Sequence, residues 1–416
     1  MTFFLLIAIA LITFAVLSWR NQKLGIILLF ALLPTYLVRF SVGPIPSTLL
    51  EGFVLITIAI AVLRSKAPPP YEGGGWGEVL NSLGWYRIPL ALAVIAGIIS
   101  TIIAPDILSA LGILKAYIIE PILLAFVITS IMVERADIER IIDALVASAT
   151  VVGVLAILQA LTHVGIPDAW AIEHRATSLF DYPNAVGLFI APIMVMAMVR
   201  LFTPSDSPLK KRKTFTGGAV LLMLGGIFAA KTEAALVAIP VALAIIGLIA
   251  PLSARIKYGI VALSITGACA MSVFAPSIIQ KITLHDSSGL VRRAQWSETL
   301  TMLADRPLLG AGLNGYPTAL APYHDATFYE IFQYPHNIFL NVWSEMGLIG
   351  LIGLIVCAIL VTRTTWRRKD DALILAFAAA LLVMLIHGLV DVPFFKNDLA
   401  ILTVFCVMGM MVKKEA

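Results

Sequence analysis

Four basic residues in the second half of the chain have side chains suited to phosphate and acid–base chemistry: Arg175, Arg292, Arg293 and His336. The guanidinium group of arginine offers a fixed fork of hydrogen-bond donors that fits phosphate oxygens. A neutral imidazole near a membrane surface can act as a general base on a sugar hydroxyl or orient a phosphate. Together these residues indicate a site for a lipid-linked diphosphate. Taken singly, each could instead contact headgroups, form a salt bridge or end a helix.

A stripe of polar residues follows His336 into an apolar segment. Asn337, Asn341 and Glu345 stand at positions i, i+4 and i+8, so they share one face of a helix. Polar groups are unfavourable in hydrocarbon, and this face must therefore meet protein or water. The stripe could line a cavity or join neighbouring helices, and for Asn341 and Glu345 we favour the packing role.

Further charged residues lie at or within the apolar segments. Lys231 and Glu233 form a tight turn that could border the same site, and Asn184 opens another apolar segment. Lys115 and Glu120 are five residues apart on one helix, so each needs a partner on another helix. No spacing typical of metal ligands appears, and we predict neither a metal site nor a cofactor.

The elements that position these residues are membrane helices. The chain has 416 residues, of which 60% are hydrophobic and 13% charged, a composition that excludes an ordinary soluble domain. We predict an all-α polytopic membrane protein with about 12–13 transmembrane helices in one domain, 1–416. The predicted spans are 2–18, 24–40, 48–63, 88–104, 107–133, 138–162, 183–202, 215–230, 234–250, 258–275, 336–361, 372–391 and 398–411.

Basic residues concentrate in alternate loops, which predicts that those loops are cytoplasmic. The long loop 276–335 then lies on the extracytoplasmic side, together with the candidate site. Within this loop, Asp286 can begin a helix and Arg306 can end it. Trp296, Leu300 and Leu303 would share one face of this helix, as in an amphipathic helix on a membrane surface. The cytoplasmic basic clusters indicate contacts with membrane lipids and not with nucleic acid.

Several ordered motifs resemble the O-antigen ligase / O-antigen polymerase superfamily of membrane glycosyltransferases. The matching segments lie within about 175–391: Arg175–Gly187, Arg292–Trp296, Asp305–Gly312, Pro335–Leu340, Glu345–Gly350 and His387–Asp391. Where many members carry Ser-Arg-Gly at a short outer turn, this chain has Lys231-Thr232-Glu233.

The resemblance implies transfer of a glycan from an undecaprenyl-diphosphate-linked donor to an acceptor hydroxyl at the outer face of the cytoplasmic (inner) membrane. The acceptor would be a lipid A-core sugar, another glycan or a protein. His336, Arg175 and Arg292 would be catalytic. Substrate-binding residues would be Arg293, Asn337, Lys231 and Asn184.

Three other functions remain open within this interpretation. The chain could be an O-antigen polymerase or a protein O-oligosaccharyltransferase of the same superfamily. It could also be a transporter or flippase for a lipid-linked glycan, although its polar residues gather near one face and not along a path across the membrane.

Overall fold

The computed structural model describes residues 2–43, 45–64, 83–202, 210–274, 280, 283–325 and 327–413. The helices that correspond to predicted spans are α1 (Thr2–Arg20), α2 (Gln22–Ala31), α3 (Leu49–Arg64), α5 (Arg87–Ile102), α6 (Ile107–Ile113), α7 (Glu120–Ile131), α8 (Arg135–Thr162), α10 (Pro183–Phe202), α11 (Lys210–Ala230), α12 (Glu233–Ile249), α13 (Ala254–Phe274), α17 (Ile338–Arg367), α18 (Ala372–His387) and α19 (Asn397–Gly409). A π-helical turn, Leu114–Ile119, joins α6 to α7.

Every predicted span overlaps a helix, and α6 with α7 makes one span. Within the described ranges, six helices are long and apolar enough to cross a membrane, and several shorter apolar helices accompany them. These findings confirm an all-α polytopic membrane protein.

The second predicted span, 24–40, is wrong in its second half. Helix α2 ends at Ala31, because Pro34 cannot continue the helical hydrogen-bond ladder. A 3₁₀ turn (Leu33–Leu37) follows, and then an antiparallel hairpin of β1 (Arg39–Val42) and β2 (Ile45–Thr48), with Arg39 opposite Thr48. The apolar run in the sequence continues through the 3₁₀ turn to Phe40, which hid the end of α2 and the start of β1.

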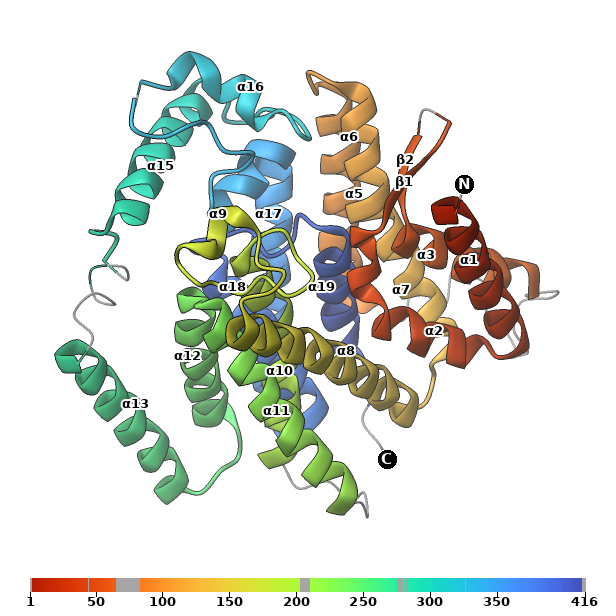
Figure 1. Ribbon diagram of the computed structural model, residues 1–416, viewed down its shortest axis with the longest axis vertical. Coiled ribbons are helices and arrows are strands. Elements are labelled where there is room, and N and C mark those ends of the chain that lie inside the picture. Colours follow the sequence, from red (N-terminus) through yellow and green to blue (C-terminus); the bar gives the residue numbers. More distant parts are fainter. Residues whose placement is uncertain are drawn as a thin grey trace.

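Helix α10 lies at the centre of the bundle and packs against α8, α11 and α18 (Figure 1). Its residues from Ala185 to Ala197 are buried throughout, as expected for a helix enclosed by other helices. By contrast, α13 stands at the edge of the molecule beside α12. The packing of α10 against these helices therefore holds its first turn, which contains Asn184, in place.

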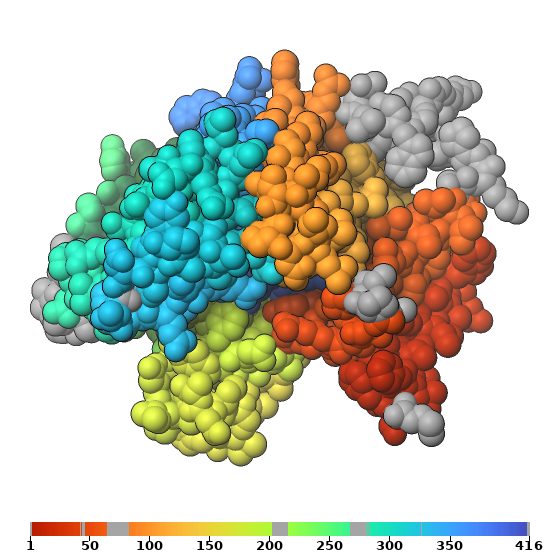
Figure 2. Space-filling view, turned by 90° about the horizontal axis from the view of Figure 1, so that it is seen from above, coloured from red at the N-terminus to blue at the C-terminus, as the bar shows by residue number. Residues whose placement is uncertain are grey.

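The loops that hold the candidate residues gather toward one end of the bundle, here called the loop face. It carries the β1–β2 hairpin, α6, and the helices α15 (Ser287–Asp305) and α16 (Tyr316–Leu320). Figure 2 looks down on this face, where the teal and cyan loop adjoins orange α5–α6 and the red N-terminal segment. The short helix α9 (Asp168–Ala171) belongs to the yellow-green loop at its margin.

The predicted loop helix is present as α15, and Asp286 caps it by accepting a hydrogen bond from the Gly289 amide at 2.9 Å. Its buried face differs from the prediction. Leu303 is buried, but Leu300 is 51% exposed, while the polar residues Gln295 and Thr299 are fully buried. The reason is that both polar side chains find hydrogen-bond partners within the loop.

Helix α17 is broken near the loop face. Gly347 has φ +64° and ψ −170°, a conformation that L side chains rarely adopt. The Leu348 amide donates to the Leu308 carbonyl (2.9 Å), and the Ala311 amide donates to the Ser344 carbonyl (2.6 Å). Residues 338–346 therefore form a short helix that is hydrogen-bonded to the loop.

Candidate active site

The candidate residues meet at the turn that follows α18, residues 388–391, here called the 388–391 turn. The backbone amide of Ile338, the side-chain amide of Asn337 and Nε of Arg292 donate to the carbonyls of its first three residues. These bonds measure 2.7, 3.1 and 3.1 Å, respectively. Asn337 also caps α17, since its Oδ1 accepts from the amides of Phe339 and Leu340. The turn thus joins α15, α17 and α18.

Asp391 ends the turn and faces His336. The distance from His336 Nδ1 to Asp391 Oδ1 is 3.6 Å, which is too long for a hydrogen bond but within reach of an ion pair. Burial opposes ionisation of Asp391, but the neighbouring imidazoles of His336 and His387 hold its pKa below the usual value. Because Nδ1 of His336 faces the carboxylate, Nε2 lies on the opposite edge of the ring. The His336 side chain is 23% exposed.

Asn184 connects Asp391 to Arg175. Its Nδ2 donates to Asp391 Oδ2 at 3.3 Å, and its Oδ1 accepts from Arg175 Nη2 at 2.9 Å. Arg175 also donates from Nε to the Ala230 carbonyl at 3.2 Å and lies 5.3 Å from the Trp170 ring centroid. Arg175 therefore belongs to the same network as His336, with its guanidinium already engaged by protein groups.

Lys231 borders this network. Its carbonyl accepts a long bond of 3.5 Å from Arg175 Nη2, and its ammonium group donates to the Glu173 carbonyl at 2.6 Å. Its φ of +51° is unusual for a residue with a β-carbon. Arg293 differs from the others: it is exposed on α15, and none of the contacts described above includes it.

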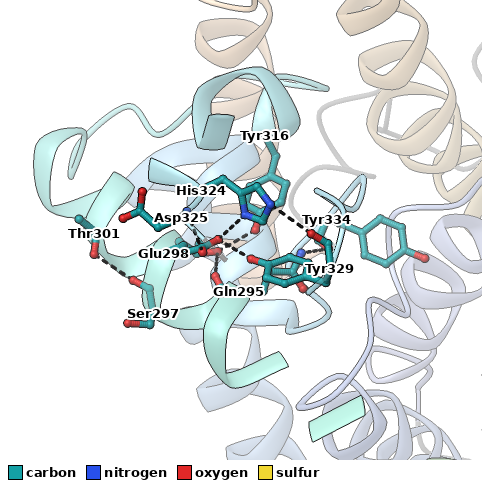
Figure 3. Close-up of polar contacts among 10 residues, drawn as sticks. Gln295, Ser297, Glu298, Thr301, Tyr316, His324, Asp325, Tyr329 and Tyr334 are labelled. Carbon is teal, nitrogen blue, oxygen red and sulfur yellow. Dashed lines mark hydrogen bonds and ion pairs between the residues drawn. The ribbon is translucent and has the colours of Figure 1, made fainter. Parts of the chain in front are cut away.

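Helix α15 fixes the segment before His336 (Figure 3). Gln295 Nε2 donates to the Tyr334 carbonyl at 3.0 Å. Trp296 Nε1 donates to the Pro335 carbonyl at 2.7 Å. These bonds hold two successive carbonyls immediately before His336, whose own φ is +48°. Left-handed backbone at a non-glycine residue is held in place by its surroundings, and such residues are common at functional sites.

A second cluster in the same loop holds the chain that leads to this segment (Figure 3). Glu298 accepts hydrogen bonds from His324 Nδ1 at 2.9 Å and from the Tyr329 hydroxyl. The other ring nitrogen of His324 faces the Tyr329 carbonyl at 3.2 Å. The hydrogen bond to Glu298 raises the pKa of His324. The cluster thus fastens His324 and Tyr329 to α15.

The short outer part of α17 separates two hollows. A polar cavity of about 850 Å³ lies on the side of Asn341 and Glu345, and an apolar groove of about 310 Å³ lies on the side of Ile338, Val342 and Met346. Tyr117 borders both. A polar cavity beside an apolar groove matches the two halves of an amphiphilic molecule.

Two of the intramembrane charged residues, Lys115 and Glu345, have partners in the protein, whereas neither carboxylate oxygen of Glu120 has a hydrogen-bond partner among the described residues. Lys115 pairs with Glu51 of α3 at 3.1 Å, as expected for a partner on another helix. Glu345 accepts from the amides of Asn314 and Tyr316 and so holds the loop against α17. In the described ranges, no three His, Cys, Asp or Glu side chains gather as metal ligands would.

Asp391 is the site residue that the sequence reasoning missed. It stood in a recognised motif, His387–Asp391, but nothing assigned it a role. The available signal was an acidic residue that closely follows an apolar helix and lies at the same end of the bundle as His336.

The comparison with protein families finds one matching segment. Residues 218–355 match the family model described as O-Antigen ligase. This segment includes Arg292, His336 and Asn337 but neither Arg175 nor the 388–391 turn. No curated protein matches the chain. The family match confirms the O-antigen ligase-like resemblance and supports glycosyl transfer of the ligase and polymerase type in general.

Proposed function

We propose, from this family match, that the chain transfers a glycan from an undecaprenyl-diphosphate-linked donor to a hydroxyl group of an acceptor. The observation that carries the proposal is the meeting of His336, Arg292 and the Arg175–Asn184 pair at the 388–391 turn. A histidine beside a buried carboxylate and next to arginines suits a reaction that removes a proton and releases a diphosphate.

In the proposed reaction, the acceptor oxygen forms a bond to the anomeric carbon of the donor sugar. The bond between that carbon and the diphosphate oxygen breaks, and the diphosphate leaves with both bonding electrons. Nε2 of His336 takes the proton of the acceptor hydroxyl and later releases it to solvent or to the leaving group. Asp391 orients the imidazole, because its carboxylate faces Nδ1.

The arginines would act on the charge that develops on the diphosphate. Arg292 uses Nε in its bond to the 388–391 turn, which directs its terminal amino groups away from that bond. Arg175 keeps Asn184 in contact with Asp391 and would hold the diphosphate only with part of its fork. Arg293 and Lys231, both exposed, would contact the outer part of the donor headgroup.

Two hollows support a lipid-linked donor. The apolar groove follows α17 from Ile338 to Trp366 and would take part of the polyprenyl chain. It meets the polar cavity at Tyr117, near the end of α17 that carries His336. The charge pattern of the loops supports an outer location for this end of the bundle.

The acceptor could be a lipid A-core sugar, a growing glycan or a protein. A transporter for a lipid-linked glycan is the second candidate function, and the apolar groove along α17 is the observation that favours it.

The test uses the full chain in lipid nanodiscs with a polyprenyl-diphosphate glycan and a panel of acceptors, followed by product analysis. We expect a covalent glycan–acceptor product from the native chain and none above background from His336→Ala. Movement of the donor between leaflets in vesicles, without any product, would refute glycosyl transfer and favour the transporter.

A further inference from the structure

The walls of the polar cavity come largely from parts of the chain that the candidate active site does not use. They include the hairpin 39–48, α6 and segments 180–182 and 395–397. The hairpin and α6 lie outside the family match at 218–355. The volume of about 850 Å³ is within the range of small-molecule sites.

The cavity combines aromatic rings with short polar side chains. Among its aromatic residues are Tyr117, Tyr182, Tyr334 and Phe395. Rings of this kind offer flat apolar surfaces, and the tyrosine hydroxyls add hydrogen-bonding groups. A sugar ring has the matching character, with apolar C–H faces and a rim of hydroxyl groups.

Two buried amides at the cavity wall have unused hydrogen-bonding atoms. Asn341 is 1% exposed, and its Nδ2 has no partner among the described residues. The same holds for Oδ1 of Asn397, which is 3% exposed. Buried polar atoms are nearly always paired, so the wall offers a donor and an acceptor to a polyhydroxylated ligand.

The charges around the cavity are mixed. Arg39 and Lys396 are balanced by Asp181, Glu51 and Glu345. Lys396 contacts the Tyr182 hydroxyl, and its ammonium group lies 4.0 Å from the ring centroid. Since both signs are present, the cavity suits a hydroxyl-rich ligand better than a polyanion.

The cavity adjoins the candidate active site along two segments. The Tyr334 ring borders the cavity, and its centroid lies 4.8 Å from that of His336. Asp181 and Tyr182 also border it and lead directly to Asn184. A ligand in the cavity could therefore place one end next to His336.

We propose that the polar cavity is an oligosaccharide-binding site in which the hairpin 39–48 and α6 select the glycan. The proposal rests on glycosyl transfer as the function of the chain. The glycan could belong to the donor or to the acceptor, because both present the same chemistry to this wall.

The test fills the cavity at Gly112, which borders it in α6. A β-carbon added there meets no atom within 4 Å, so Gly112→Trp directs an indole into open space. Gly259→Trp is the matched control, because an added β-carbon at this exposed position of α13 also meets no atom within 4 Å. Arg39→Gln is a second variant, on the exposed part of the hairpin.

Binding is measured by titrating the full chain in nanodiscs with three probes. They are polyprenyl diphosphate without sugar, the donor glycan released from its lipid, and a lipid A-core oligosaccharide without its acyl chains. We expect Gly112→Trp to weaken binding of one glycan at least about 10-fold, and Arg39→Gln to weaken it several-fold. Gly259→Trp should bind like the native chain, and the sugar-free lipid should bind equally to all variants.

The probe whose binding is weakened shows whether the cavity binds the glycan of the donor or that of the acceptor. Equal glycan binding by Gly112→Trp and Gly259→Trp, with Arg39→Gln also unchanged, would overturn the proposal. If Gly112→Trp does not fold, Arg39→Gln alone decides between these outcomes. Because the readout is binding and not transfer, it remains informative if His336→Ala retains activity and the proposed catalytic site fails.

Discussion

Helix α18 has an aspartate just outside each end, and the two differ in how their charges are balanced. Asp371 precedes the helix and Asp391 follows it, and both are about equally buried, with 3% and 2% side-chain exposure. Asp371 is enclosed by cations and helix amides. Asp391 faces a histidine and an amide. The same residue type thus serves two purposes at the two ends of one helix.

At the Asp371 end, every requirement of the carboxylate is met. Arg135 and Arg368 both donate to it, the latter at 2.7 Å, and its Oδ1 caps α18 by accepting from the Leu373 amide at 3.0 Å. Burial alone would raise the pKa of Asp371, but the two arginines lower it to about 2. Such a closed cluster stabilises the fold.

At the Asp391 end, the balance is incomplete. Nδ1 of His336 faces the carboxylate at 3.6 Å, and its hydrogen bonds come from the Asn184 side-chain amide and the Val392 backbone amide. The carboxylate of Asp371 is occupied by two arginines and helix amides, whereas Asp391 faces an imidazole whose Nε2 is left for a substrate. The comparison therefore distinguishes a carboxylate that stabilises the fold from one that would position a candidate catalytic histidine.

The largest expected effect is that of His336→Ala. Loss of the general base should reduce transfer by about 10²–10⁴-fold while leaving the melting temperature nearly unchanged. Product formation from a polyprenyl-diphosphate glycan measures the first, and thermal unfolding in detergent measures the second. Transfer at the native rate by a folded variant would remove His336 from the mechanism.

Asp391→Asn tests the same end of the helix through the partner of His336. The amide keeps the shape but lacks the negative charge that faces Nδ1 of His336 and orients the ring, so transfer should fall by on the order of 10²-fold. The substrate KM should change much less than kcat. If Asp391→Asn lowered the stability and left kcat unchanged, Asp391 would, like Asp371, serve to stabilise the fold.

Arg292→Ala and Arg293→Ala form a matched pair on neighbouring positions of α15. Removal of Arg292 should reduce transfer by about 10²-fold, because it takes away a donor near the developing diphosphate charge. Removal of Arg293 should reduce it only a few-fold, since that side chain is exposed and outside the network. Equal losses in both variants would contradict this division.

Asp371→Asn is the counterpart of Asp391→Asn at the start of α18. It removes the buried carboxylate that pairs with two arginines and should destabilise the fold by about 3 kcal/mol. The kcat of the protein that remains folded should match that of the native chain. A selective loss of kcat in this variant would contradict the assignment of Asp371 to stability.

The smallest expected effect is on acid stability. The folded-state pKa of Asp371, about 2, lies below its ordinary value of 3.8, so its contribution is present above pH 4 and is lost as pH falls through 2. The native chain should lose stability over this window. Asp371→Asn should lose less there, as thermal unfolding from pH 5 to pH 2 would reveal.

Much of the architecture could be predicted because hydropathy alone locates the apolar helices. Spans such as 183–202 and 372–391 are long apolar runs, and the structure has helices there. The hairpin of β1 and β2 could not be predicted in this way, since the apolar run that begins in α2 extends to Phe40, within β1, and hydropathy does not show that the helix ends before Pro34.

The candidate site was partly predictable for a similar reason. His336 and Arg292 stand out as polar residues at the end of an apolar segment and in a long loop. Their contact with the 388–391 turn depends on the packing of α17 against α18, and no local pattern encodes it. The two hollows on either side of residues 338–346 likewise exist only once distant segments meet.

The break at Gly347 couples two parts of the molecule mechanically. In an unbroken helix, the Leu348 amide would bond to the Ser344 carbonyl, but here Leu308 takes the amide and Ala311 takes the carbonyl. The chain at 308–311 is thus inserted into the hydrogen-bond ladder of α17. The Ala311–Ser344 bond ties 308–311 to the short helix that follows His336, and the Leu348–Leu308 bond ties it to the rest of α17. The short helix therefore cannot shift against the rest of α17 without breaking one of the two bonds.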